Sequence, residues 1–224
     1  ESIVVRNPLN AEQSSSALFR AFFNNPNEAK VWGMEVEGRK KLGFLDDLVG
    51  SRFAEYFTIG ANYTYIHARV DRIEAEITRA QPFFGVAPGG SAQFTALDDS
   101  RRLFGQPEWI VNADLTFEQP DWGTKVTLAW YAISDVLDAA GSVFIGANGV
   151  TQSYVPDPYI DNYGQLDLIV GQELWRGLSL TLQAKNLTDS RRRIIYDPYQ
   201  TSGEIPERSV KLGRDFKLQL NYSF

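Results

Sequence analysis

The strongest signal in the sequence is a strict alternation of apolar and polar residues near the end of the chain. From Phe216 to Phe224 every second residue is apolar, and the residues between them are polar. Successive side chains point to opposite sides of a β-strand, so this period of two predicts a strand with one apolar and one polar face. Clear repeats of the pattern occur at 178–185, 125–132 and 109–117, and weaker ones at 166–171, 53–70, 31–42 and 1–7. We expect about eight strands and find no helical stretch of comparable strength.

The connections between these strands have two very different lengths. Short connections lie at 119–123 and 175–177, with a longer turn around 44–52, and long polar or Gly/Pro-rich connections lie near 8–28, 71–105, 136–160 and 188–209. Short and long connections alternate, so all long ones fall at one end of an antiparallel sheet. Membrane β-barrels have this asymmetry. A soluble β-sandwich has mostly short loops of similar length at both ends.

Composition and hydropathy agree with a folded all-β protein. Hydrophobic residues make up 43% of the 224, and 5 Trp, 10 Tyr and 14 Phe are too many aromatics for a disordered chain. The longest apolar run, Leu128–Ile133, is far shorter than the roughly 20 residues of a spanning helix. We therefore expect an antiparallel sheet that forms part of a membrane-spanning barrel. A complete small barrel with a structural or adhesive role and a soluble carbohydrate-binding sandwich are the alternatives.

The alternation assigns side chains to the two faces of this barrel wall. The residues expected to face lipid are Leu178, Leu180, Leu182, Phe216, Leu218, Leu220, Tyr222 and Phe224, and those expected to face the lumen include Thr181, Lys185, Lys217, Gln219 and Asn221. Aromatic residues near the short turns and at the chain end should form one interfacial girdle, because amphipathic rings favour the headgroup level. They are Phe117, Trp122, Trp175, Tyr222 and Phe224.

Several classes of chemistry are excluded by what the sequence contains. It has no cysteine and one histidine, His67, so thiolate chemistry is ruled out and a catalytic Ser/His/Asp site is not expected. We expect no enzyme activity and no cofactor. A net charge of −6 argues against nucleic-acid binding. Loop aspartates could hold calcium or could be solvated carboxylates, namely Asp98, Asp99, Asp135, Asp138, Asp157 and Asp161.

One local cluster is basic and aromatic. Arg191, Arg192 and Arg193 are followed by Tyr196, in a connection expected to be extracellular. Guanidinium groups pair well with oxyanions, so this cluster could meet lipopolysaccharide phosphates or an anionic substrate, or it could be an ordinary solvated charge run. Together with the loop tyrosines Tyr154 and Tyr159, these residues are the candidate substrate contacts.

An ordered set of short motifs resembles the C-terminal part of the barrel of TonB-dependent outer-membrane receptors. Each motif is weak alone, but the set covers residues 30–224 in the order and spacing of that family. The motifs are Gly33-Met34-Glu35-Val36-Glu37-Gly38, Asn62-Tyr63-Thr64-Tyr65, Gly105-Gln106-Pro107, Lys185-Asn186-Leu187-Thr188-Asp189, Gly213-Arg214-Asp215-Phe216 and a terminal strand ending at Phe224.

The resemblance implies a large barrel of about 22 strands around an N-terminal plug. Residues 1–224 would then be its C-terminal portion, with the plug, the TonB box and the earlier strands outside this chain. The resemblance also implies import of a scarce nutrient such as an iron chelate, cobalamin or oligosaccharide. The implied partners are TonB with its inner-membrane complex, the barrel insertion machinery, lipid and lipopolysaccharide, with a surface lipoprotein as a further possibility. Tyr222 and Phe224 would belong to the assembly signature.

Overall fold

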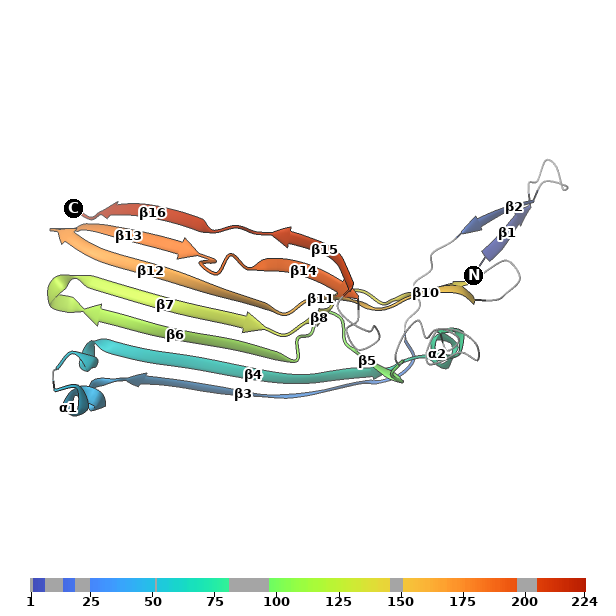
Figure 1. Ribbon diagram of the computed structural model, residues 1–224, viewed down its shortest axis with the longest axis horizontal. Helices are drawn as coiled ribbons and strands as arrows, with labels where there is room; N and C mark the ends of the chain where they lie inside the picture. The colour runs from blue at the N-terminus through green and yellow to red at the C-terminus, as the bar shows by residue number, and fades with distance from the viewer. Residues whose placement is uncertain are drawn as a thin grey trace.

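The chain forms a broad, open antiparallel sheet in a computed structural model that describes residues 2–6, 14–18, 25–50, 52–80, 97–145, 151–196 and 205–224. Figure 1 shows its long strands lying side by side in the order β16-β13-β12-β7-β6-β4-β3, with β5 paired to β4. Their bounds are β3 (Ala29–Lys41), β4 (Phe57–Asp71), β5 (Ser100–Arg102), β6 (Trp109–Gln119), β7 (Thr124–Ile133), β12 (Tyr163–Trp175), β13 (Leu178–Lys185) and β16 (Asp215–Tyr222). The predicted all-β, antiparallel architecture is confirmed.

A four-stranded extension continues this sheet at one end. It consists of β15 (Ile205–Lys211), β14 (Arg191–Tyr196), β11 (Pro158–Ile160) and β8 (Val136–Leu137). In Figure 1, β14 and β15 follow the lines of β13 and β16 beyond short breaks. Two further hairpins pair β1 (Ser2–Arg6) with β2 (Ser14–Leu18) and β9 (Ser142–Ile145) with β10 (Thr151–Val155). The sequence pattern predicted loops for the long connections near 8–28, 71–105, 136–160 and 188–209. That prediction was incomplete, because each of these connections contains at least one strand.

Helical segments are short and lie at the ends of strands. The turn from β3 to β4 contains η1 (Gly43–Leu45), α1 (Asp46–Val49) and η2 (Ala54–Tyr56), the β6–β7 turn contains η4 (Pro120–Trp122), and α2 (Glu74–Ala80) follows β4. Figure 1 shows α1 and the C-terminus at one end of the sheet, and α2, β5, β8 and β11 at the other. This confirms that long connections gather at one end. Within the described ranges, no helix has the length and apolarity needed to cross a membrane.

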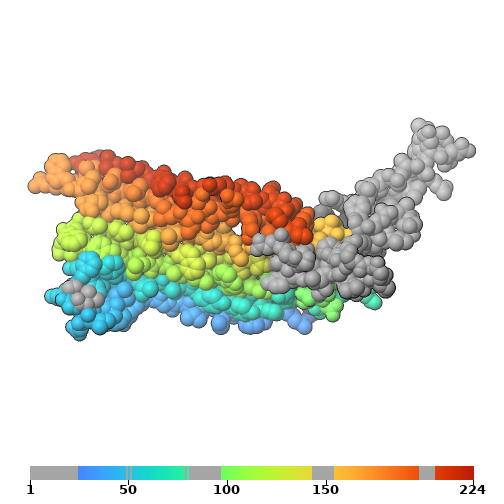
Figure 2. Space-filling view, viewed as in Figure 1, coloured from blue at the N-terminus to red at the C-terminus, as the bar shows by residue number. Residues whose placement is uncertain are grey.

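The register confirms that the predicted apolar residues share one face. Leu182 lies opposite Leu218 and Leu180 opposite Leu220, while Thr181 lies opposite Gln219 on the other face. The same alternation runs through the next strands, where Leu128 is opposite both Leu168 and Leu115. Figure 2 shows the strands packed into one continuous slab from β16 to β3. One side of the slab is therefore an apolar surface that runs across all its long strands.

This apolar surface is exposed in the isolated chain. Phe216, Leu218 and Leu220 are 66%, 68% and 63% exposed. The buried apolar cluster found in the described part of the chain contains only Leu137, Tyr159 and Ile195. A soluble sandwich would bury such a surface against a second sheet. A contiguous exposed apolar face of this size instead indicates contact with lipid.

The end of the slab that carries the short turns is rich in aromatic residues. Phe53 lies 5.6 Å from Phe117, and Phe117 lies 6.2 Å from Trp122, measured between ring centroids. Tyr222 and Phe224 lie 6.1 Å apart at the same end. The aromatic residues lie where the predicted girdle requires them.

Gly177 closes the β12–β13 turn with φ +79°, and a Cβ at that position would collide with the carbonyl oxygen of Ser223.

Substituting Leu218 by arginine should destabilise the membrane-embedded sheet. Because its side chain lies on the apolar face near the middle of β16, we expect a loss of about 2 to 4 kcal/mol in the free energy of unfolding. The measurement is denaturant unfolding of the full-length protein refolded into lipid vesicles. Gln219→Arg, on the polar face, is the matched control and should cost less than half as much. Equal losses would contradict the assignment of the faces.

Candidate functional site

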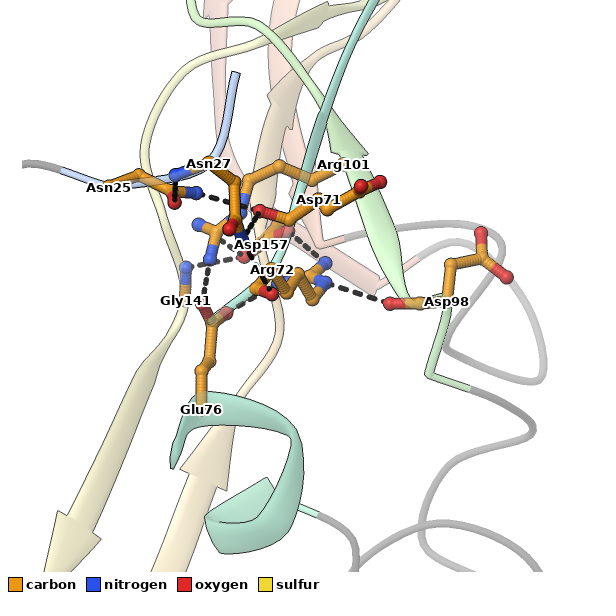
Figure 3. Close-up of polar contacts among 9 residues, drawn as sticks. All are labelled: Asn25, Asn27, Asp71, Arg72, Glu76, Asp98, Arg101, Gly141 and Asp157. Atoms are coloured by element: carbon orange, nitrogen blue, oxygen red, sulfur yellow. Dashed lines mark hydrogen bonds and ion pairs between the residues drawn. The ribbon is translucent and has the colours of Figure 1, made fainter. Parts of the chain in front are cut away.

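A buried arginine forms the centre of a charged cluster at the end of the slab that carries the long connections (Figure 3). The Arg72 Nη2 donates to Asp157 Oδ2 at 2.6 Å, and its Nη1 donates to Glu76 Oε1 at 2.5 Å. Its Nε donates to the carbonyl oxygen of Asp98 at 3.0 Å. Arg101 also donates to Glu76 and lies 3.8 Å from Asp157. The side chains of Arg72 and Asp157 are 2% and 0% exposed, so this is a fully buried ion pair.

A second arginine cluster adjoins the first. Arg102, on β5, pairs with Asp135 at 3.0 Å and with Glu108 at 3.0 Å, and Glu108 also receives a hydrogen bond from Arg69 at 2.9 Å. The guanidinium of Arg102 lies over the ring of Tyr159, 5.5 Å from its centroid, which is a cation–π contact. These residues come from β4, β5 and β11, from the position just before β6 and from the segment just after β7. The cluster therefore fastens together connections that are far apart in the sequence.

Backbone groups complete the cluster. Asn25 and Asn27 donate side-chain hydrogen bonds to the carbonyl oxygen of Asp71 at 2.7 and 3.1 Å (Figure 3). The backbone N–H of Gly141 donates to Asp157 Oδ1 at 2.6 Å. A Cβ at Gly141 would collide with the carbonyl oxygen of Val155, so only glycine permits this close approach. Both oxygens of Asp157 are thus satisfied although the side chain is buried.

The electrostatics keep the buried arginines charged. Burial disfavours the charged form of Arg72, but Asp157 and Glu76 outweigh it and raise the pKa of Arg72 above its ordinary value. Burial likewise opposes the charge of Arg102, and its hydrogen bond and charge pairing with Asp135, together with Glu108, raise its pKa. A buried charge is tolerated when it is paired and hydrogen-bonded in this way.

The ion pairs hold the charged side chains of the site in place, but the site offers few groups that could take part in catalysis. A small cavity of about 170 Å³ lies among the arginine side chains and Tyr159. The part of the chain that the structure describes contains no group of three or more His, Asp or Glu side chains placed to hold a metal ion. Three of the loop aspartates that could have bound calcium pair with arginine instead: Asp135 with Arg102, Asp157 with Arg72, and Asp161 with Arg193.

The structure separates the residues that the sequence suggested as substrate contacts. Arg191, Arg192, Arg193 and Tyr196 lie on β14, which was expected to be a loop. Arg191 and Arg192 are exposed, Tyr196 is half-buried, and Arg193 Nε donates to Asp161 Oδ2 at 2.8 Å.

The two predicted tyrosines lie elsewhere. Tyr154, on β10, and Tyr159, on β11, are both buried. Tyr159 is the member of the predicted set that reaches the arginine cluster. Whether any of the six residues binds a substrate stays a prediction.

The central residues of the cluster were not predicted. Arg101-Arg102 next to Asp98-Asp99 is a local charge signal, but solvated loop charges produce the same pattern. The pairing of Arg72 with Asp157 spans 85 positions and depends on the order of the strands. Only the topology shows that these side chains meet.

A second polar surface covers the face of the slab opposite the apolar one. Asn62 donates to Glu35 across β3 and β4, and Arg39 pairs with Asp114 at 2.8 Å. Thr116 and Thr127 share a hydrogen bond of 3.0 Å across β6 and β7. Such cross-strand pairs leave this face hydrated and charged.

Comparisons with known proteins found a matching family model and a similar solved structure. A sequence model of the family described as "TonB dependent receptor-like, beta-barrel" matches residues 3–187. Among solved structures, the siderophore receptor PiuA from Acinetobacter baumannii is similar, with a TM-score of 0.47 and 14% identity. The match covers 88% of this chain and 22% of that receptor, so the chain spans about a fifth of its length. No curated protein matches the chain.

Removing the charge of Asp157 should open the cluster locally. With Asp157→Asn, Arg72 and Arg101 lose a buried counter-charge, and we expect the free energy of local opening to fall by about 3 kcal/mol. The measurement is hydrogen exchange of the amides of α2 and β11 in the full-length protein.

The control is Glu118→Gln, which removes a pairing with Lys125 that is more than half exposed and should cost under about 1 kcal/mol. Unchanged exchange in the Asp157 variant would show that the cluster does not hold these connections.

Proposed function

Because the chain belongs to the TonB-dependent receptor β-barrel family, we propose that the whole protein is an active importer of the bacterial outer membrane. The family consists of receptors and transporters rather than enzymes, and it places the chain in the outer membrane. The proposed cargo is a scarce nutrient such as an iron chelate, cobalamin or an oligosaccharide. Import would be driven through TonB and its inner-membrane complex, acting on parts of the protein outside this chain.

The observation that supports this proposal is a sheet with one apolar and one polar face, whose long connections lie at one end. The apolar face suits contact with lipid, and the polar face suits a hydrated lumen that a plug occupies. The pairs Glu35–Asn62 and Arg39–Asp114 lie on that polar face, which in this proposal contacts the plug. The end with the arginine cluster would lie outside the cell, because long connections of such barrels are extracellular.

Among the six predicted residues, we propose Arg192 and Tyr196 as the substrate contacts. Both lie on the same side of β14, because they are four residues apart in a strand. The charge of Arg192 lies near Tyr163, whose hydroxyl donates to Gln165 at 2.8 Å on the polar inner face. Tyr154 and Tyr159 are buried, and Arg193 is engaged with Asp161, so in this proposal they position the surface rather than touch the cargo.

Loss of TonB should abolish import by the full-length receptor. The experiment measures uptake of radiolabelled probes, namely a ferric hydroxamate, cobalamin and a maltooligosaccharide, by cells that carry the receptor with and without TonB. We expect at least one probe to be taken up only when TonB is present. Uptake that continues unchanged without TonB would favour a passive channel, and uptake of none would favour a structural barrel.

Replacing Arg192 and Tyr196 together by Gln and Ala should weaken binding of the imported probe. Loss of one charge-assisted contact and one aromatic contact should lower affinity by about tenfold or more. Arg52→Gln is a matched charge-removing control at the opposite end of the slab, where Arg52 is highly exposed. Probe binding that is lowered equally by both changes, or by neither, would remove these residues from the proposed site.

A further inference from the structure

The polar face of the slab becomes apolar at its end next to the four-stranded extension. Ile133 lies opposite Tyr163 on β12 and opposite Ile110 on β6, so the three side chains form a row across adjacent strands. Ile133 is an even number of residues from Thr127, which bonds Thr116 on the polar face, so the row belongs to that face. These pairs are the last of the main sheet before β8 and β11 begin.

The apolar surface continues across the slab toward β3. On β4, Ile66 shares a side with Asn62, and the unshifted β3–β4 ladder places Val31 on that side as well. Tyr131, on the same side of β7 as Ile133, is 37% exposed, and Val31 is 61% exposed. The remaining members of this surface are half-buried. The inner apolar band, as we call it, consists of Val31, Ile66, Ile110, Tyr131, Ile133 and Tyr163.

The same face is polar between the inner apolar band and the short turns. Its inward residues there include Gln165 and Asp167 on β12, Asn112 and Asp114 on β6, and Glu35 and Glu37 on β3. Ile169 is an isolated aliphatic side chain in this region, because it lies opposite Thr127 and Gln183. The ladders are regular, so a change of polarity at a similar level in neighbouring strands makes the band a continuous surface.

The inner apolar band adjoins a positive charge. The charge of Arg192 lies near Tyr163. Arg192 is exposed, and no carboxylate pairs with it among the residues that the structure describes. Asp167 lies on the same face, but its Oδ1 accepts from Gln165 Nε2 at 2.7 Å and from the backbone N–H of Asn186 at 2.9 Å. The negative charge is thus hydrogen-bonded within the sheet, and the guanidinium of Arg192 can pair with an anion.

A ligand that suits both features has an apolar ring and a negative charge. Ile66, Ile110 and Ile133 cannot form side-chain hydrogen bonds, so a hydroxyl-rich sugar on them would lose bonds to water without replacement. Aromatic rings, in contrast, pack on aliphatic side chains and make offset or edge-on contacts with tyrosine rings. Oxyanions form charge-assisted hydrogen bonds with guanidinium groups. A neutral ligand would leave Arg192 unpaired.

We propose that the inner apolar band selects a cargo whose negative charge is carried on aromatic rings. Among the nutrients proposed above, a ferric chelate with catecholate groups has this chemistry. Its rings lie on Ile110, Ile133 and Tyr131, and its charge faces Arg192. The inference rests on the proposed import function, because it names the class of cargo that the importer takes. It excludes oligosaccharides, cobalamin and chelates without rings as the preferred cargo.

The test is equilibrium binding of labelled probes to the purified full-length receptor in detergent micelles. The first probe is the ferric complex of a tripodal tris-catecholamide, which is negatively charged and aromatic. The comparison probes are ferric citrate, which is charged but has no ring, a neutral ferric hydroxamate, cobalamin and a maltooligosaccharide. We expect the catecholate complex to bind about tenfold or more tightly than every comparison probe.

Substitutions in the inner apolar band should lower the affinity for the catecholate complex. We expect Ile133→Asn and Tyr131→Ala each to lower it by about tenfold, and Tyr131→Phe to leave it unchanged because the ring is retained. Ile169→Asn is the matched control, because it makes the same change on the same face, at a side chain that is 39% exposed in the polar region. It should leave the affinity unchanged.

Correct folding of each variant is checked by its migration on an unheated gel. Failure of the catecholate complex to bind, or equal affinity for ferric citrate, would overturn the proposal. Ile133→Asn that lowers the free energy of unfolding but not the affinity would also overturn it, since the plug would then cover the band. Binding in micelles does not need TonB. A receptor that binds the catecholate complex without TonB-dependent uptake would therefore defeat the proposed import and support the inner apolar band as a binding surface.

Discussion

The backbone of a chain that crosses a bilayer must satisfy its own hydrogen bonds, because hydrocarbon offers none. Here that requirement is met by long antiparallel ladders such as β3–β4, which runs without a shift from Ala29–Val70 to Lys41–Thr58. The ladder fixes the register, and the register fixes which side chains share a face. The apolar side, the polar side and the gathering of long connections at one end all follow from this one constraint.

At the break between the main sheet and its four-stranded extension, side chains pair the backbone groups that the strand ladder leaves unpaired. Asn186 has φ 55°, its Oδ1 accepts from the N–H of Ser190 at 2.9 Å, and its Nδ2 donates to the carbonyl oxygen of Gly213 at 2.7 Å. Asparagine tolerates this left-handed conformation better than most residues. The break therefore keeps backbone groups paired while it separates a lipid-facing sheet from an extension held by buried arginines.

The alternation of apolar and polar residues in the sequence was enough to predict the strands that have one hydrated and one lipid-facing side. It missed β14, because Arg191–Arg193 and Ile194–Ile195 interrupt the period of two, and it missed α2, which is only seven residues long. The arginine cluster was beyond sequence reasoning for a different reason. Arg72 and Asp157 meet only because β4, β5 and β11 are brought to one end of the slab, and such pairing of distant segments leaves no local pattern.

The most direct test of the account is a spin-label scan along β16 in the full-length receptor, reconstituted in a bilayer. Labels at 216, 218 and 220 should be accessible to oxygen dissolved in lipid, and labels at 217, 219 and 221 should be accessible to a water-soluble relaxation agent. The accessibility should therefore alternate with a period of two along the strand. The reverse alternation, or equal accessibility at all six positions, would contradict the assignment of this sheet as a membrane wall.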